Sequence, residues 1–190
     1  MRHRRVVFAL IVGGVVATPF ALTRSRARAQ AVPDPCDFIT GGGFVFKDDG
    51  ARANFGAHGG CKNGSFWGHV NYVDHGGFLG ATPYHVDSTE ITGYATVAGH
   101  PNARDICGIA QTNAGETVNF RVRMEDNGQG AGAPKDQFEI HLSNGYLVSQ
   151  RPLGDADPGG GNVKLHPFNP STTAPGTASV CFDAGGPPPG

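Results

Sequence analysis

The sequence has few of the residues that favour helices and many that interrupt them. Methionine occurs twice and tryptophan once in 190 residues, and charged residues make up 16% of the chain. The chain instead contains 30 glycines and 14 prolines. After residue 31, no apolar pattern of helical period continues for long. These shortages argue against a helical protein and favour short strands joined by tight turns.

Motifs of the common enzyme classes are also missing. The chain has no Gly-x-Ser-x-Gly, no P-loop and no His-Glu-x-x-His. Residues 41–43 are three glycines that precede a predicted strand, so they predict a turn or a bulge and not a phosphate-binding loop. The paired carboxylates of a glycoside hydrolase leave no such signature. A hydrolase with a carboxylate or histidine site therefore stays open as an alternative.

The first 31 residues have the pattern of an export signal. Arg2, Arg4 and Arg5 precede an apolar run over residues 6–17, and a small-x-small site follows at residues 29–31. The run is too short to span a bilayer comfortably. We predict a signal peptide over residues 1–31, of the ordinary kind rather than the twin-arginine kind. Further basic residues before the site leave an uncleaved membrane anchor as an alternative.

Export sets the charge and the redox environment of the rest of the chain. After residue 31 there are nine basic and sixteen acidic residues, a formal net charge of −7. Such a domain is a poor electrostatic match for nucleic acid or anionic lipid and a better one for cations such as calcium. We predict a secreted or cell-envelope protein with no nucleic-acid partner and no stable membrane span after signal cleavage.

Alternation of apolar and polar residues with a period of two predicts the strands. Residues 117–124 and 138–142 show it most clearly, and turn formers fill the segment between them. Further segments of this kind are 43–47, 51–55, 65–73, 84–88, 90–97, 106–111, 145–149, 162–166 and 179–182. The prediction is an antiparallel β-sandwich or open β-barrel of about ten short strands over residues 32–168. A Pro/Gly-rich tail follows over residues 169–190.

The four cysteines predict disulfides, because an exported chain with an even number of cysteines is oxidised. They are Cys36, Cys61, Cys107 and Cys181, and three pairings are possible. We favour Cys36–Cys181, which would clamp the two ends and pin the tail, together with Cys61–Cys107. Zinc is the weaker alternative, since no Cys-x-x-Cys pair occurs.

Oxygen-bearing side chains bracket a glycine-rich loop between the two clearest strands. They are Asp126, Asn127 and Asp136. Calcium takes carboxylate and amide oxygens on flexible loops, so these residues form a predicted calcium site. Asp-Asn-Gly is also a turn sequence, and the alternative is that these side chains only cap the loop.

Aromatic and histidine side chains provide the remaining candidates. Alternation places Trp67 on the face opposite Phe66, Val70 and Tyr72. If that second face is the core, Trp67 lies on the surface, where an aromatic ring binds sugars or other polymers; packing under a loop is the alternative. Seven histidines follow the signal, and we expect His69 and His141 to meet across a strand ladder, where zinc or copper could bind.

Four motifs in series resemble the post-COAP type domain of bacterial exported proteins. The residues are 36–44 (CDFITGGGF) with 53–56 (ANFG), 68–75 (GHVNYVDH), 122–128 (VRMEDNG) with 136–138 (DQF), and 159–166 (GGGNVKLH). The resemblance implies a small all-β accessory module of secreted or surface proteins, with no established activity. This chain departs from that setting because it carries the module almost alone and has more cysteines.

The function expected from these observations is that of a secreted, non-catalytic module. Its partner would be an extracellular polymer or a surface protein, and calcium is its one candidate cofactor. A secreted hydrolase with an unrecognised site and a structural component of the envelope or matrix are the alternatives.

Overall fold

The computed structural model describes residues 27–129, 135–155 and 159–182, and every regular element in these ranges is a β-strand. The strands are β1 Ala27–Gln30, β2 Phe38–Phe46, β3 Arg52–Lys62, β4 Ser65–Asp74, β5 Tyr84–Val97, β6 His100–Thr112, β7 Thr117–Glu125, β8 Gln137–Leu142, β9 Leu147–Pro152, β10 Gly161–His166 and β11 Ser179–Phe182. The predicted all-β, antiparallel fold is confirmed. Over the described residues, no helix has the length and apolar character to cross a membrane.

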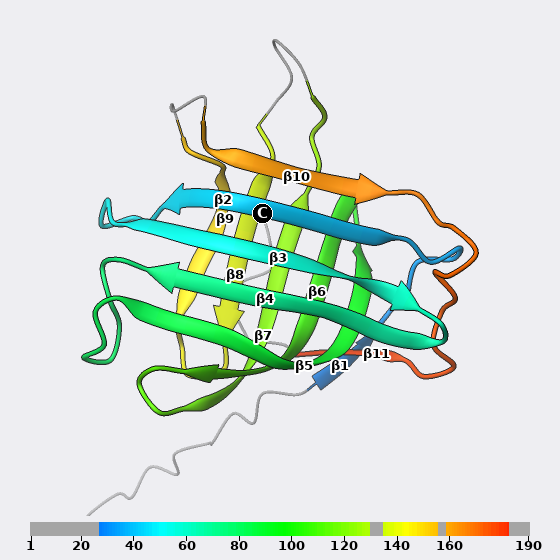
Figure 1. Ribbon diagram of the computed structural model, residues 1–190, viewed down its shortest axis with the longest axis horizontal. Coiled ribbons are helices and arrows are strands. Elements are labelled where there is room, and N and C mark those ends of the chain that lie inside the picture. The colour runs from blue at the N-terminus through cyan, green and yellow to red at the C-terminus, as the bar shows by residue number, and fades with distance from the viewer. Residues whose placement is uncertain (1–26, 130–134, 156–158, 183–190) are drawn as a thin grey trace, which may run out of the picture.

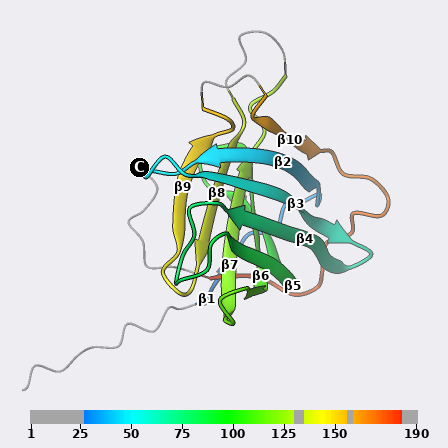
Figure 2. The same cartoon turned by 60° about the vertical axis from the view of Figure 1, so that its left-hand side comes forward.

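Nine strands form one curled antiparallel sheet in the order β10-β2-β3-β4-β5-β6-β7-β8-β9. In Figure 1, β10 and β2–β4 run across the front, and β6–β9 run steeply behind them. The long β5 carries the chain from one layer to the other, and two register shifts within it, after Ser88 and after Ile91, let it bend. The predicted strands 84–88 and 90–97 are therefore one bulged strand. Figure 2 shows the resulting half-barrel from the side.

The core fills the concave side of this half-barrel. Alternate residues of the front strands, such as Ile39, Phe55 and Tyr72, meet alternate residues of the rear strands, such as Phe120 and Phe138. The Phe55 ring, for example, stacks on the Phe138 ring with the centroids 4.0 Å apart. The interior is therefore packed with side chains, and any ligand surface has to lie on the outside of the strands.

The glycines at positions 41–43 lie within β2, so the predicted turn or bulge there is wrong. A Cβ atom at Gly41 would lie 2.9 Å from Val163 Cγ2 and 3.0 Å from Met124 Sδ, and one at Gly43 would collide with the backbone of Gly160. The glycines are needed because β10 and the core approach β2 closely.

Two disulfides are present, but the predicted pairing is wrong. The bonds are Cys36–Cys61 and Cys107–Cys181, with Cα atoms 6.1 and 5.1 Å apart. The β2–β3 hairpin brings Cys61 back beside Cys36, since Phe38 pairs with Gly60. Cys107 points outward from β6, where β11 packs against β5, β6 and β7. The disulfide therefore ties the tail to the middle of the sheet and not to Cys36.

Strand β1 lies within the segment assigned to the export signal. Its residues pair with β11, from Ala27 opposite Phe182 to Gln30 opposite Ser179. Ala31 accepts a backbone hydrogen bond from Thr96, 3.0 Å long. Cleavage after Ala31 would remove β1 and leave β11 without its partner strand. The apolar run of the predicted signal, residues 6–17, lies outside the described residues.

Candidate functional site

The convex side of β10, β2, β3 and β4 collects aromatic and histidine side chains, and we call it the outer face. One set of alternate residues on these strands is buried in the core, so the other set points outward. The register then arranges the outward residues in rows across the strands. One row is His166, Phe38, Gly60 and Trp67; the next is Lys164, Thr40, His58 and His69; the third is Asn162, Gly42, Gly56 and Asn71.

Four rings form a continuous cluster along the first two rows. His166 stacks on Phe38 with the centroids 4.4 Å apart, and the centroids of Phe38 and Trp67 are 6.1 Å apart. The His58 ring lies 5.3 Å from the Trp67 ring. Gly60 allows this approach, because a Cβ atom there would collide with Phe38. Such a row of rings offers a stacking surface to a flat apolar group.

Trp67 points outward, as its alternation predicts, and is half-buried within the ring cluster. The Lys62 ammonium lies 5.6 Å from the centroid of its ring. The indole Nε1–H is buried and has no hydrogen-bond partner in the described structure. Trp67 is therefore a partly covered member of the ring cluster rather than an isolated exposed ring.

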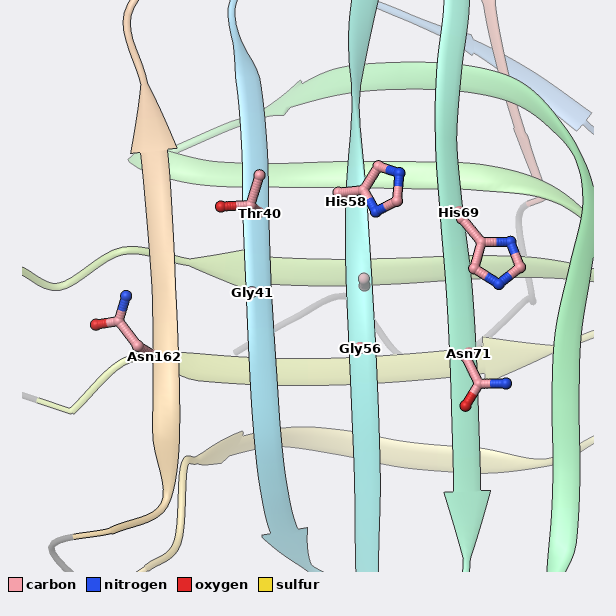
Figure 3. A pocket seen from close by; sticks show the side chains of 8 residues that line it. Thr40, Gly41, Gly56, His58, His69, Asn71 and Asn162 are labelled. Atoms are coloured by element: carbon pink, nitrogen blue, oxygen red, sulfur yellow. The ribbon is translucent and has the colours of Figure 1, made fainter.

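A shallow open groove of about 550 Å³ lies beside the ring cluster. Its walls include Thr40, His58 and His69 at one end and Asn71 and Asn162 at the sides, as Figure 3 shows. The two asparagines stand three strands apart, roughly 14 Å at the usual strand spacing, with glycines at the two positions between them. A Cβ atom at Gly56 would meet nothing within 4 Å. The groove exists because these positions carry no side chain.

Two histidines meet across a ladder on this face, but they are not the expected pair. His69 on β4 lies opposite His58 on β3, with ring centroids 6.4 Å apart. His141 lies on β8 opposite Arg121 and Leu147, far along the sheet order, so the expected meeting of His69 with His141 is wrong. Burial is the larger of two causes that lower the pKa of His58, and the positive charge of His69 is the smaller.

His69 is also the middle of a hydrogen-bonded chain that leads to β5. Its Nε2 lies 3.0 Å from Asp87 Oδ1, and its Nδ1 lies 3.1 Å from Ser88 Oγ. When Asp87 is ionised and His69 neutral, Nε2 carries the proton and Ser88 donates to Nδ1. Ser88 Oγ also accepts the Val70 backbone N–H at 2.8 Å, where β4 and β5 part.

The predicted calcium residues are hydrogen-bonded to the backbone. Asp126 accepts N–H groups from Gly128 (3.0 Å) and Leu165 (2.9 Å), and Asp136 accepts them from Asn127 (2.9 Å) and Val163 (2.6 Å). Burial alone would raise the pKa of Asp126, but these backbone donors and Lys164 lower it. Both carboxylates thereby hold the edge strand β10 against the β7–β8 loop. This geometry favours the turn interpretation over calcium, although residues 130–134 of the loop lie outside the described residues.

The sequence interpretation missed Phe38, Thr40, Asn71, Asn162 and Gly56 as site residues. A signal for them existed, because each lies at an outward position of a strand whose alternate residues are core. The sequence interpretation lacked the order of the strands, because β10 comes from a distant part of the chain and lies beside β2.

Comparison with known proteins leaves the family open. No protein-family model, no curated protein and no solved structure matches this chain. Among the described residues, no group of three or more His, Cys, Asp and Glu side chains is arranged to hold a metal ion.

Proposed function

We propose that this chain is an exported, non-catalytic β-module that binds an extracellular polysaccharide in the groove on its outer face. The resemblance to post-COAP type domains and the two disulfides support an exported accessory module. The observation that carries the binding role is the groove, which has a floor without side chains, asparagines at both sides and the ring cluster beside it. A purely structural protein has no need of such a surface.

The parts of the groove match the needs of a sugar chain. The rings of Phe38 and Trp67 present apolar faces for stacking against sugar rings. Asn162 Oδ1 accepts a hydrogen bond from Gln129 Nε2, and Asn71 Nδ2 donates one to Asp87 Oδ1 at 3.4 Å. The remaining donors and acceptors of the two amides suit hydroxyl groups. The groove is open along its length, so a polymer can lie across the strands without its ends being enclosed. These features suit an extended chain better than a small molecule, which binds in an enclosed pocket.

The test is to fill the groove without disturbing the fold. Gly56→Val adds a strand-compatible side chain where a Cβ atom has open space. We expect the variant to keep its stability and to lose binding to immobilised polysaccharides in affinity electrophoresis. Leu147→Ala is the matched control, because it removes an exposed apolar side chain from β9, at the other end of the sheet. Equal retention of wild type and Gly56→Val on every polysaccharide that binds would refute the proposal.

A second candidate function, ester hydrolysis, is favoured by the Asp87–His69–Ser88 chain. A nucleophile within reach of a base, which a third group orients, is the arrangement used for acyl transfer. Ser88 Oγ would attack the carbonyl carbon while His69 Nδ1 takes its proton and passes it to the leaving group; water would then release the acyl group. An organophosphonate probe that labels wild type and Asp49→Ala but not Ser88→Ala supports this function, and failure to label wild type excludes it.

A further inference from the structure

The outer face differs in charge from the rest of the chain. The outward residues of β10, β2, β3 and β4 include Arg52, Lys62 and Lys164 and no aspartate or glutamate. Yet the chain after residue 31 has a formal net charge of −7. These three side chains form a cationic strip on a domain that is acidic as a whole. Such a strip can attract a negatively charged partner.

Two of these cations have no carboxylate partner in the described structure. Arg52 lies over the Phe44 ring at 3.9 Å and Lys62 over the Trp67 ring at 5.6 Å, and neither takes part in an ion pair there. Lys164 is 3.4 Å from Asp126, which already accepts backbone hydrogen bonds. The strip therefore keeps positive charge beside the groove.

Three histidines lie on the outer face and could carry further positive charge. His58 lies between Thr40 on β2 and His69 on β4, with Trp67 beside it and Lys164 one strand further on. His166 bonds Thr40 Oγ1 through Nε2 at 3.0 Å. Among the described residues, Asp87 on β5 is the carboxylate that contacts His69, and it receives a 3.4 Å hydrogen bond from Asn71. A protonated imidazole is a cation, so protonation of these side chains would make the strip more positive.

From this arrangement we infer that the ligand of the groove is an acidic polysaccharide, and that His58 and His69 tighten its binding at acidic pH. The inference rests on the proposed polysaccharide-binding function and names the ligand class and its regulation. A carboxylate or sulfate group of the polymer would lie near His58 and His69, where two opposed imidazolium groups otherwise repel each other. By linkage, the bound anion and the protons favour each other.

The lowered pKa of His58 agrees with this role. In the free protein, burial and the charge of His69 keep His58 neutral to more acidic pH than usual. An anion bound beside His58 offsets the repulsion by His69 and raises the pKa of His58 in the complex. His58 therefore holds its proton in the complex at a pH at which it is neutral in the free protein. Binding therefore strengthens as pH falls through the range in which His58 titrates.

The experiment uses the full chain and two polymers with one backbone. Polygalacturonate and its methyl ester differ only in charge, and binding is measured by calorimetry at pH 5.5 and 7.5 and at two salt concentrations. We expect the acid form to bind more tightly than the ester. Each charge at an exposed site is worth up to about fivefold in affinity, so the two histidines should raise the affinity for the acid form by roughly five- to twenty-five-fold from pH 7.5 to pH 5.5. High salt should remove most of it.

Variants connect the effect to the histidines. His58→Gln with His69→Gln should abolish the gain at pH 5.5, whereas His75→Gln, an exposed histidine after β4, should keep it. A sulfated polymer that binds with the same pH profile would support a general anion preference of the site. Equal affinity for acid and ester would refute the inference but leave polysaccharide binding intact. If wild type binds neither polymer but binds a neutral polysaccharide in affinity electrophoresis, the inference is refuted and the proposed function stands. If wild type binds no polysaccharide, the proposed function itself is refuted. Equally tight, pH-dependent binding of duplex DNA would refute the sugar preference.

Discussion

Replacement of Asp136 by alanine should destabilise the fold strongly, because this carboxylate holds an edge strand in place. Strand β10 is the last strand of the sheet and pairs only with β2. Its Val163 N–H, which β2 does not satisfy, donates to Asp136 Oδ2 at 2.6 Å, and Asn127 N–H donates to Oδ1 at 2.9 Å. The side chain is buried, with 6% of its residue surface exposed.

The magnitude follows from those two bonds. A hydrogen bond to a charged group contributes about 1.5–3 kcal/mol, and a buried donor left without a partner costs a similar amount. Asp136→Ala should therefore lower the free energy of unfolding by about 3–6 kcal/mol, a large share of the 5–15 kcal/mol that a domain commonly has. Asp136→Asn keeps one acceptor oxygen and should lose roughly half as much.

Urea denaturation measures this effect, with Trp67 as the single fluorescent tryptophan. Asp49→Ala is the matched control, because Asp49 also accepts a backbone N–H, from Ala51 at 2.9 Å, but its side chain is 60% exposed. The control should change stability by less than about 1 kcal/mol. A loss below that value for Asp136→Ala would refute the idea that the carboxylate clamps β10. A calcium-induced rise in the melting temperature of wild type, absent in Asp136→Asn, would instead support the calcium interpretation.

Three further predictions concern stability. The pKa of Asp126 is lowered in the folded state. The stabilisation by its carboxylate is therefore complete above the pKa of the unfolded chain and is lost as the pH falls through the folded pKa. Acid titration should show wild type to be more stable than Asp126→Asn only above that pH range. Tyr146→Phe removes the hydroxyl that donates to buried Asp74 at 2.8 Å and contacts Tyr72 OH at 2.7 Å, and should cost about 1–3 kcal/mol in urea denaturation. A non-reducing peptide map should link Cys36 with Cys61 and Cys107 with Cys181, and loss of the second bond should cost more, about 4.5 against 3.5 kcal/mol in the chain-entropy model, because it closes the longer loop.

The residues of the motifs named above divide between the buried core and the groove. Tyr72 and Asp74 lie in a buried network with Tyr146 and Lys47, and burial together with the neighbouring Tyr72 and Asp74 raises the pKa of Tyr146. Asp126 and Asp136 cap β10. Three of the motifs also supply the outer face, with Phe38 and Thr40 from the first, His69 and Asn71 from the second, and Asn162 and His166 from the closing one.

The sequence alone determined the all-β class, the approximate positions of most strands and the two faces of the clearest ones, but it missed β1 and the first half of β2. Period-two alternation is a local property, so it located β7 and β8 correctly and assigned Trp67 to the side away from Tyr72. It divided β5 into two strands, because a bulge breaks the alternation where the strand bends. The glycines at 41–43 predicted a turn or bulge, whereas in β2 they permit close packing. In a sequence, a glycine needed for a turn cannot be told from a glycine needed for close approach of two strands.

Only the tertiary structure decided which residues meet. The hairpin return brought Cys61 to Cys36, the placement of β11 brought Cys181 to Cys107, and the register of β3 with β4 set His58 opposite His69. The groove depends on β10 joining β2 from the far end of the chain. These contacts arise from strand order and register, which depend on the packing of the whole core. The residues next to each partner in the sequence therefore do not indicate which residue it meets.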